Sequence, residues 1–191
     1  MAGSARYTAV LDANVLYPTL VRDMLMSLAT ADLYHARWTS QIHDEWTRAL
    51  AKNRPDIAEK LPDVVTLMNR AVPDCLIENY ESLIPAIQLP DANDRHVVAA
   101  AIRGHADAIV TFDVDDFPLD ELNKYNIEIQ HPDTFILNQI HLHKIGALSA
   151  IKRMRARWRN PEFTAEELVR TLEARGLPFS ADSLREAIEL I

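Results

Sequence analysis

The chain has 191 residues, of which 48% are hydrophobic and 25% charged, and this composition suffices for one buried core with an appended segment. The formal net charge of −8 argues against simple electrostatic binding of nucleic acid by the molecule as a whole. No apolar run approaches the roughly 20 residues that span a bilayer, and the N-terminus lacks the apolar segment of a signal peptide, so we expect a cytoplasmic protein with no membrane partner.

Strand and helix signals alternate along the chain as far as about residue 140. Short apolar runs with β-branched residues indicate strands, and apolar stripes at helical spacing behind a Pro, Ser or Thr indicate helices. The predicted strands are 7–11, 36–38, 75–77, 108–112 and 127–129, and the predicted helices are about 18–28, 40–51, 56–71 and 94–103, with another from Pro132. Strands separated by helices form a parallel sheet with helices on both faces, so the fold class is α/β.

Beyond residue 140 only helix signals remain. The predicted helices run over about 141–158, with a break at Asn160-Pro161, from the capping box Thr164-Ala165-Glu166-Glu167 to Gly176, and from a cap at Ser180 to the end. The charge changes in the same region: residues 1–140 carry 11 Lys/Arg and 21 Asp/Glu, whereas residues 141–191 carry 9 and 7. We therefore expect an α/β domain over residues 1–140 and a helical extension over residues 141–191.

Two of the predicted strands are followed directly by an aspartate. Asp12 follows the run 7–11, and Asp113 follows the run 108–112. Ligands of open parallel sheets bind beyond the carboxyl ends of the strands, so both carboxylates are expected in one crevice. A helix or turn cap is the other interpretation of Asp12, and Asn14 could orient a ligand or simply make the turn.

Glu45 lies on the predicted helix 40–51, close to its apolar face. On a helical wheel it falls within roughly 60° of Ile42, whereas Asp44 points away. An ionised carboxylate on a buried face is costly unless it is paired or bound to a cation. A salt bridge with Arg48 or another arginine is one interpretation, and a site shared with the strand-end acids is the one we favour.

Further acids lie at the start of the helix 94–103 and after Asp113. We expect one of Asp91 and Asp94 to cap the helix, and we assign Asp94 to the crevice because it begins the helix directly before the adjacent strand. In the acidic loop, Asp115 is expected to face water, and Asp116 stays close to the candidate site.

Four carboxylates gathered at one point would repel one another. Two unit charges about 4 Å apart cost about 4 kcal/mol at an effective dielectric constant of about 20, a large part of the roughly 5–15 kcal/mol that stabilises a domain. Either the acids are protonated or they hold hard cations, and oxygen ligands suit Mg²⁺ or Mn²⁺. This arrangement favours metal-assisted hydrolysis of phosphodiester bonds.

Motifs of several other enzyme classes are missing from the sequence. The four glycines form neither a dinucleotide-binding loop nor a Walker loop, and no G-x-S-x-G elbow occurs. His141 and His143 are expected to face apart on one helix, and we interpret all seven histidines as ordinary surface residues. Cys75, the single cysteine, has no disulfide partner in the chain and is expected to be an inert core thiol.

With these residues the chain resembles the PIN-domain nucleases, and in particular a VapC-like bacterial subgroup with a helical C-terminal extension. The matching segments within residues 6–140 are 10–14, Glu45, 94–101 and 110–118, and the tail from Asn160 is similar to that subgroup as well. The resemblance implies a three-layer α/β/α sandwich and an Mg²⁺- or Mn²⁺-dependent ribonuclease. It also implies products with 5′-phosphate and 3′-hydroxyl ends, and in bacteria often a toxin that pairs with an antitoxin and forms a homodimer.

The resemblance also assigns site residues. The acids of the family map onto Asp12, Glu45, Asp94 and Asp113, with Asp116 close by. The subgroup often has Asn at the position of Asp113, and the later acid then serves in its place. The relative roles of Asp113 and Asp116 therefore stay open.

A basic segment lies near the start of the extension, and its members are Lys152, Arg153, Arg155, Arg157 and Arg159, with Trp158 among them. A solvated helix surface is the default interpretation. Our hypothesis is that Arg153, Arg155 and Arg157 supply the RNA phosphate contacts that the acidic domain cannot. An acidic protein partner could use the same side chains.

Three classes of function are compatible with these observations. The leading hypothesis is a metal-dependent endoribonuclease, in which Asp12, Asp94 and Asp113 bind metal and Glu45 binds metal or orients the attacking water. The alternative is a non-catalytic PIN-like module that binds RNA or protein. A phosphoryl-accepting aspartate domain ranks low, because Ala13-Asn14 supplies no second acid beside Asp12.

Overall fold

The structure, a computed structural model, describes residues 7–159 and 162–191. These residues form two compact units, one built from 7–22 and 34–131 and the other from 23–33 and 132–191. The helix break predicted at Asn160-Pro161 lies outside the described residues. Within them, no helix is long and apolar enough to cross a membrane.

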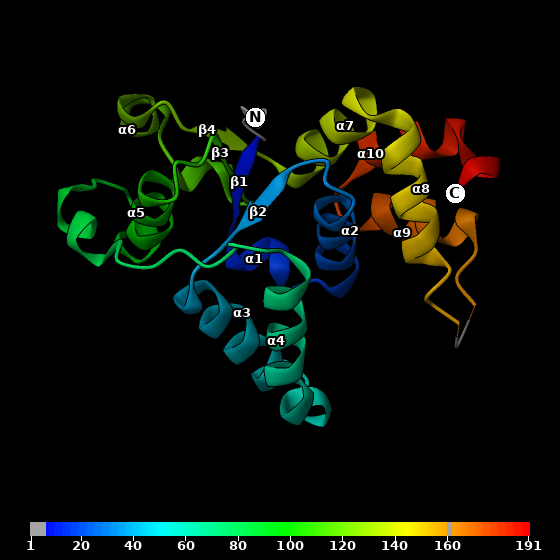
Figure 1. The fold of residues 1–191 in the computed structure, drawn as a ribbon, viewed down its shortest axis with the longest axis horizontal. Helices are drawn as coiled ribbons and strands as arrows, with labels where there is room; N and C mark the ends of the chain where they lie inside the picture. Colours follow the sequence, from blue (N-terminus) through cyan, green and yellow to red (C-terminus); the bar gives the residue numbers. More distant parts are fainter. Residues whose placement is uncertain (1–6, 160–161) are drawn as a thin grey trace. The chain divides into compact units, whose positions relative to one another are not determined.

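The first unit is built on a parallel sheet of four strands (Figure 1). The strands are β1 (Thr8–Leu11), β2 (His35–Arg37), β3 (Ala108–Val110) and β4 (Glu128–Gln130), and their order in the sheet is β2-β1-β3-β4. Val10 pairs with Ile109, and Ile109 pairs with Ile129, so the chain leaves β1 and β3 at the same edge of the sheet. Every residue of β3 is buried, as expected for a strand covered on both faces.

Helices and short 3₁₀ turns connect these strands. In chain order they are α1 (Ala13–Leu16), α3 (Ser40–Asn53), η1 (Pro55–Lys60), α4 (Leu61–Ala71), η2 (Glu81–Ala86), η3 (Ala92–Asp94), α5 (Arg95–Arg103), η4 (Val114–Asp116), α6 (Leu119–Leu122) and η5 (Asn123–Tyr125). Helix α2 (Thr19–Thr30) begins in this unit and continues in the second. A parallel sheet flanked by helices, followed by C-terminal helices, confirms the predicted α/β/α fold class.

Helix α5 carries the longest buried apolar run of the first unit, residues 97–101, and it packs on β1 and β3. The C-cap of α5, Gly104, lies tightly against Ile77, because a Cβ at position 104 would stand 2.6 Å from the Ile77 Cδ1 atom. This packing places the N-terminus of α5, where Asp94 lies, near the edge at which β1 and β3 end.

The second unit is helical, as the sequence predicts. It contains α7 (Pro132–Leu142), α8 (Lys144–Arg155), α9 (Ala165–Ala174), α10 (Pro178–Glu186) and the turn η6 (Ile188–Leu190). The predicted capping box at the start of α9 is confirmed, since Thr164 and Glu167 each accept a hydrogen bond from the other's backbone N–H. Gly176 follows α9 with a φ of 79°, a value that favours glycine.

Several predicted boundaries are wrong for local reasons. The helix expected over 56–71 is a 3₁₀ turn followed by α4, because Pro62 starts a new helix. The helix expected over 141–158 is instead the end of α7 and the separate helix α8, because His143 adopts a non-helical φ of −138°. The strand expected at 75–77 is reduced to one bridge between Leu76 and Trp38.

The predicted cap at Ser180 is also wrong. Ser180 lies inside α10, which begins two residues earlier at Pro178. The backbone N–H of Ser180 donates instead to the Asp133 carboxylate on α7, at 2.7 Å. A side chain distant in sequence therefore provides the cap for α10.

Candidate acidic active site

Asp12 lies at the junction of β1 and α1 and is 7% exposed. Its Oδ1 accepts a hydrogen bond from the Ala13 backbone N–H at 2.6 Å, so it does cap α1. Its Oδ2 accepts a second hydrogen bond from the Thr111 hydroxyl at 2.8 Å. Burial raises the pKa of Asp12 above its usual range, and the negative charge of Glu45 raises it further.

The loop after β3 is tied to the loop after β1 by Asn14. The Asn14 Nδ2 donates to Thr111 Oγ1 at 2.7 Å and to Asp113 Oδ2 at 3.0 Å, and its Oδ1 accepts from the Phe112 backbone N–H at 3.1 Å. Asp113 itself is exposed. These bonds hold both strand-end aspartates, Asp12 and Asp113, in one network through Thr111 and Asn14.

Glu45 reaches the site from α3, which Thr39 caps. Its Oε1 lies 3.0 Å from Nε2 of His96, and Gln41 Nε2 donates to the same oxygen at 3.3 Å. The partner of Glu45 is thus a buried histidine of α5, and the salt bridge with Arg48 considered above is not among the ion pairs of the described residues.

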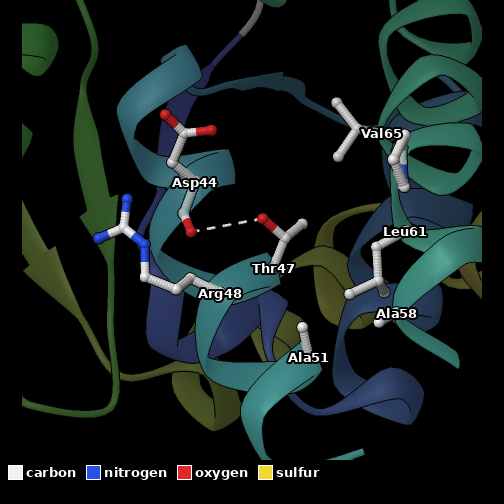
Figure 2. Close-up of a pocket in the computed structure, with 8 residues that line it drawn as sticks. Asp44, Thr47, Arg48, Ala51, Ala58, Leu61 and Val65 are labelled. Carbon is white, nitrogen blue, oxygen red and sulfur yellow. Dashed lines mark hydrogen bonds between the residues drawn. The ribbon is translucent and has the colours of Figure 1, made fainter. Parts of the chain in front are cut away.

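The neighbouring acid, Asp44, faces elsewhere. Figure 2 shows it at a groove between α3 and the segment formed by η1 and α4, where Thr47 donates to its backbone oxygen at 3.3 Å. The groove has a volume of about 480 Å³ and an apolar side that includes Ala58, Leu61 and Val65. The helical wheel therefore separates the faces of Asp44 and Glu45 correctly.

Asp91 and Asp94 differ in their hydrogen bonds. The Asp91 carboxylate caps η3 by accepting from the Asn93 backbone N–H at 2.8 Å, whereas Asp94 makes no capping bond. The pKa of Asp94 is raised to about 6, first by burial and then by the negative charges of Asp12, Asp91 and Asp116. Asp94 is therefore close enough to these acids to be repelled by them.

The acids thus form a connected cluster on the first unit. Asp12 is coupled electrostatically to Glu45 and Asp94, and Asp94 is coupled to Asp116. Asp113 joins the cluster through Asn14 and Thr111. In the part of the chain that the structure describes, no three His, Cys, Asp or Glu side chains lie in an arrangement that would already enclose a metal ion.

The chemistry of the donor set nevertheless fits a hard divalent cation. Carboxylate oxygens are the ligands that Mg²⁺ and Mn²⁺ prefer, and Mg²⁺ sites are commonly completed by water and substrate phosphate. The pKa values of Asp12 and Asp94 are raised mainly by burial and further by the negative charges of neighbouring acids, and a bound cation would offset both effects.

Two residues of this network were not predicted from the sequence. The sequence predicts Thr111 as a strand residue and His96 as a surface histidine. His96 is 4% exposed, and His43 is equally buried, so the interpretation of all histidines as surface residues is wrong. The apolar run 97–101 directly after His96 was the one sequence signal that could have placed its ring in the core.

The three arginines proposed for RNA contacts have partners within the second unit. Arg157 pairs with Asp23 at 2.6 Å and donates to Ser27, and Arg155 donates to the Phe163 and Ile191 backbone oxygens. Arg153, which is exposed, donates to the Ser149 hydroxyl at 2.8 Å on its own helix. Arg153 is thus the one of the three without a partner outside its own helix among the described hydrogen bonds.

An acidic cluster at the carboxyl edge of a parallel sheet flanked by helices defines the class of this protein. Residues 8–115, more than half of the chain, match the PIN domain, and the chain belongs to this family. Residues 132–186 match the VapC50 C-terminal domain.

The chain is also similar to a curated protein. The chain is 37% identical over 106 residues to a protein named "Putative ribonuclease VapC50" from Mycobacterium tuberculosis (strain ATCC 25618 / H37Rv). The aligned region covers 56% of this chain and 62% of the relative. No solved structure matches the chain.

Proposed function

We propose that this protein is a divalent-metal-dependent endoribonuclease. The observation that carries the proposal is the gathering of Asp12, Glu45, Asp94 and Asp116 at one edge of the PIN-domain sheet. There burial, and secondly the negative charges of neighbouring acids, raise the pKa values of Asp12 and Asp94. The name of the relative, a ribonuclease, supports RNA as the substrate. The activity is assigned to the domain expected over residues 1–140, with residues 141–191 as its helical extension.

In this proposal Asp12, Glu45, Asp94 and Asp113 hold Mg²⁺ or Mn²⁺, and Asp116 adds charge beside Asp94. A bound divalent ion supplies a water of lowered pKa and stabilises negative charge on the leaving oxygen. The protein contributes by positioning: Thr111 and the Ala13 backbone N–H hold Asp12 in one orientation. Asn14 holds Asp113 in the same way, which leaves Asp116 the less restrained of the two later acids.

The partners follow from the same proposal. Because the chain is similar to VapC proteins, we propose that it is the toxin of a toxin–antitoxin pair and that an antitoxin protein is its partner. We also propose that it forms a homodimer and acts in the cytoplasm. We further propose that Arg153, Arg155 and Arg157 contribute positive charge toward RNA, with Arg153 the most available of the three. The non-catalytic PIN-like module becomes an outcome of the test below.

The test is a cleavage assay on single-stranded RNA and DNA, with and without Mn²⁺. We expect RNA to be cut only with metal, and Asp12→Asn or Asp94→Asn to lower the rate by about two orders of magnitude or more, because each removes a ligand charge. Asp115→Asn, in the exposed part of the acidic loop, serves as the matched control and should cleave like the wild type. RNA binding without turnover under Mn²⁺ would indicate the non-catalytic module.

A further inference from the structure

His96 is a buried histidine that meets one of the proposed metal ligands. It is the second residue of α5 and only 4% exposed. Asp94 lies two residues before it in the chain, and the buried run 97–101 follows it directly. Its Nε2 lies 3.0 Å from Oε1 of Glu45, on α3. Two helices that are far apart in sequence therefore meet through this polar contact at the acidic cluster.

Packing alone does not account for an imidazole at this position. The other ring nitrogen, Nδ1, is buried and has no hydrogen-bond partner among the described residues. A buried polar atom without a partner is unfavourable compared with an aliphatic side chain of similar size. Because Nδ1 has no acceptor, the ring proton belongs on Nε2, which donates to the Glu45 carboxylate.

The polar side-chain contacts described for Glu45 all reach one of its two oxygens. His96 and Gln41 both approach Oε1, at 3.0 and 3.3 Å, and no bond to Oε2 occurs among the residues that the structure describes. The Glu45 side chain is 34% exposed and has three rotatable bonds before its carboxylate, so without such restraint it would sample several rotamers. Two donors on Oε1 restrict the carboxylate and leave Oε2 available.

We propose that His96 is a positioning residue, which holds Glu45 through Oε1 so that Oε2 can bind the divalent ion. This inference rests on the proposed function, because it takes Glu45 as a metal ligand. Residues that orient metal ligands typically change metal affinity or activity by about 10–100-fold when they are replaced. A structural tether between α3 and α5 is the competing role, and it would affect stability alone.

A pair of amide substitutions separates these roles. In His96→Gln the side-chain nitrogen falls near the place of the imidazole Nε2 and can still donate to Glu45. In His96→Asn the side-chain nitrogen falls near the place of Nδ1, and the side chain is too short for this nitrogen to reach Glu45. Both variants keep a polar amide at position 96, so they differ mainly in the hydrogen bond.

The experiment measures Mn²⁺ affinity by calorimetric titration, RNA cleavage kinetics and melting temperature for each variant. We expect His96→Asn to lower Mn²⁺ affinity and kcat by about tenfold or more, with KM for RNA unchanged within about twofold, and His96→Gln to restore both quantities to within about threefold. His43→Asn is the matched control, because His43 is a buried histidine on the same helix as Glu45 that bonds to Asn69 and Trp46. It should lower the melting temperature and leave Mn²⁺ affinity unchanged.

Wild-type Mn²⁺ affinity and kcat in His96→Asn would overturn the inference, and so would an equal loss in His96→Gln. If His96→Asn does not fold, His96→Phe replaces it, since it fills the ring volume without a donor and the same losses are expected. Different results would reject the endoribonuclease function and the positioning role of His96. Cleavage that survives Asp12→Asn rejects the proposed function, whereas abolished cleavage in Asp12→Asn beside a normal His96→Asn rejects the role of His96 alone.

Discussion

Asp94 shows at the scale of one residue how a candidate active site lowers the stability of its own fold. Its carboxylate makes no capping bond, it is partly buried, and it is repelled by Asp12, Asp91 and Asp116, so its pKa rises to about 6. Such repulsion is tolerated where a ligand of opposite charge relieves it. The charge on Asp94 should therefore be unfavourable in the metal-free protein and favourable in the metal-bound one.

Substitution of Asp94 by Asn tests this relation. In metal-free buffer we expect Asp94→Asn to melt about 2–4 °C higher than the wild type, the shift that corresponds to about 1 kcal/mol in a chain of this size after solvent screening of the exposed part. Added Mn²⁺ should then raise the melting temperature of the wild type but not of the variant. A variant that melts lower than the wild type without metal would show that Asp94 is stabilising.

Cys75 illustrates a residue whose chemistry is suppressed by its surroundings. Its side chain is 3% exposed and lies against Asn69, and burial raises the pKa of the thiol. Because the thiolate is the reactive form, we expect Ellman's reagent at pH 8 to react at least about 100-fold more slowly with the native protein than with the urea-unfolded chain. Raising the pH should accelerate the native reaction, and equal rates in both states would contradict the buried thiol.

At the scale of elements, α7 and α10 are held together by a buried carboxylate. Asp133 of α7 is 2% exposed and accepts hydrogen bonds from the backbone N–H groups of Phe179 and Ser180, at 2.8 and 2.7 Å. The Ser180 hydroxyl donates in return to the Asp133 backbone oxygen at 3.1 Å. The negative charge lies at the N-terminus of α10, where the helix dipole favours it.

Removal of this carboxylate should weaken the second unit. We expect Asp133→Ala to lower the free energy of unfolding by about 2–4 kcal/mol, because two buried N–H groups lose their acceptor. Urea denaturation followed by circular dichroism measures the change. Asp182→Ala is the control, since Asp182 lies on α10, the helix that Asp133 caps, is 66% exposed and pairs only with Arg185 among the described ion pairs. A similar loss in both variants would mean that the acceptor role of Asp133 is unimportant.

The starts of the helices show which capping residues can be predicted from neighbouring residues alone. Thr164 caps α9 as the sequence predicts, and Thr39 caps α3 in the same way, because a capping oxygen and the backbone N–H that donates to it lie within one turn of the chain. Ser180 fails as a cap for the opposite reason: Pro178 already begins α10, and the capping oxygen comes from Asp133. No pattern around residue 180 contains that information.

At the scale of the whole molecule, the distribution of charge is more informative than its sum. The net charge of −8 combines an acidic segment up to residue 140 with a slightly basic segment after it. Within the basic segment, Arg157 is neutralised by Asp23, and Arg155 binds backbone oxygens, whereas Arg153 contacts only Ser149 of its own helix among the described partners. The three arginines are therefore not equivalent.

The salt dependence of RNA binding can distinguish the roles of Arg153 and Arg157. If Arg153 contacts a phosphate, Arg153→Gln should reduce the slope of log affinity against log salt by about 0.7, the value of one phosphate contact to a single strand. Arg157→Gln should change the slope less and instead lower the melting temperature, because Asp23 loses its partner. Fluorescence anisotropy with a catalytically inactive Asp12→Asn protein provides the measurement. An unchanged slope in Arg153→Gln would reject its role in RNA binding.

The sequence by itself determined the α/β/α class, the strands that end at Asp12 and Asp113, and the helical face on which Glu45 lies. These features depend on periodicity and on groups a few residues apart, so they can be deduced from the order of the residues. Only the tertiary structure decided which polar groups meet the acids: His96 meets Glu45, Thr111 meets Asp12 and the Ser180 backbone N–H meets Asp133. Each of these contacts joins segments that are far apart in the chain. The distance between such segments in space depends on how the whole core packs, and no local sequence pattern contains that information.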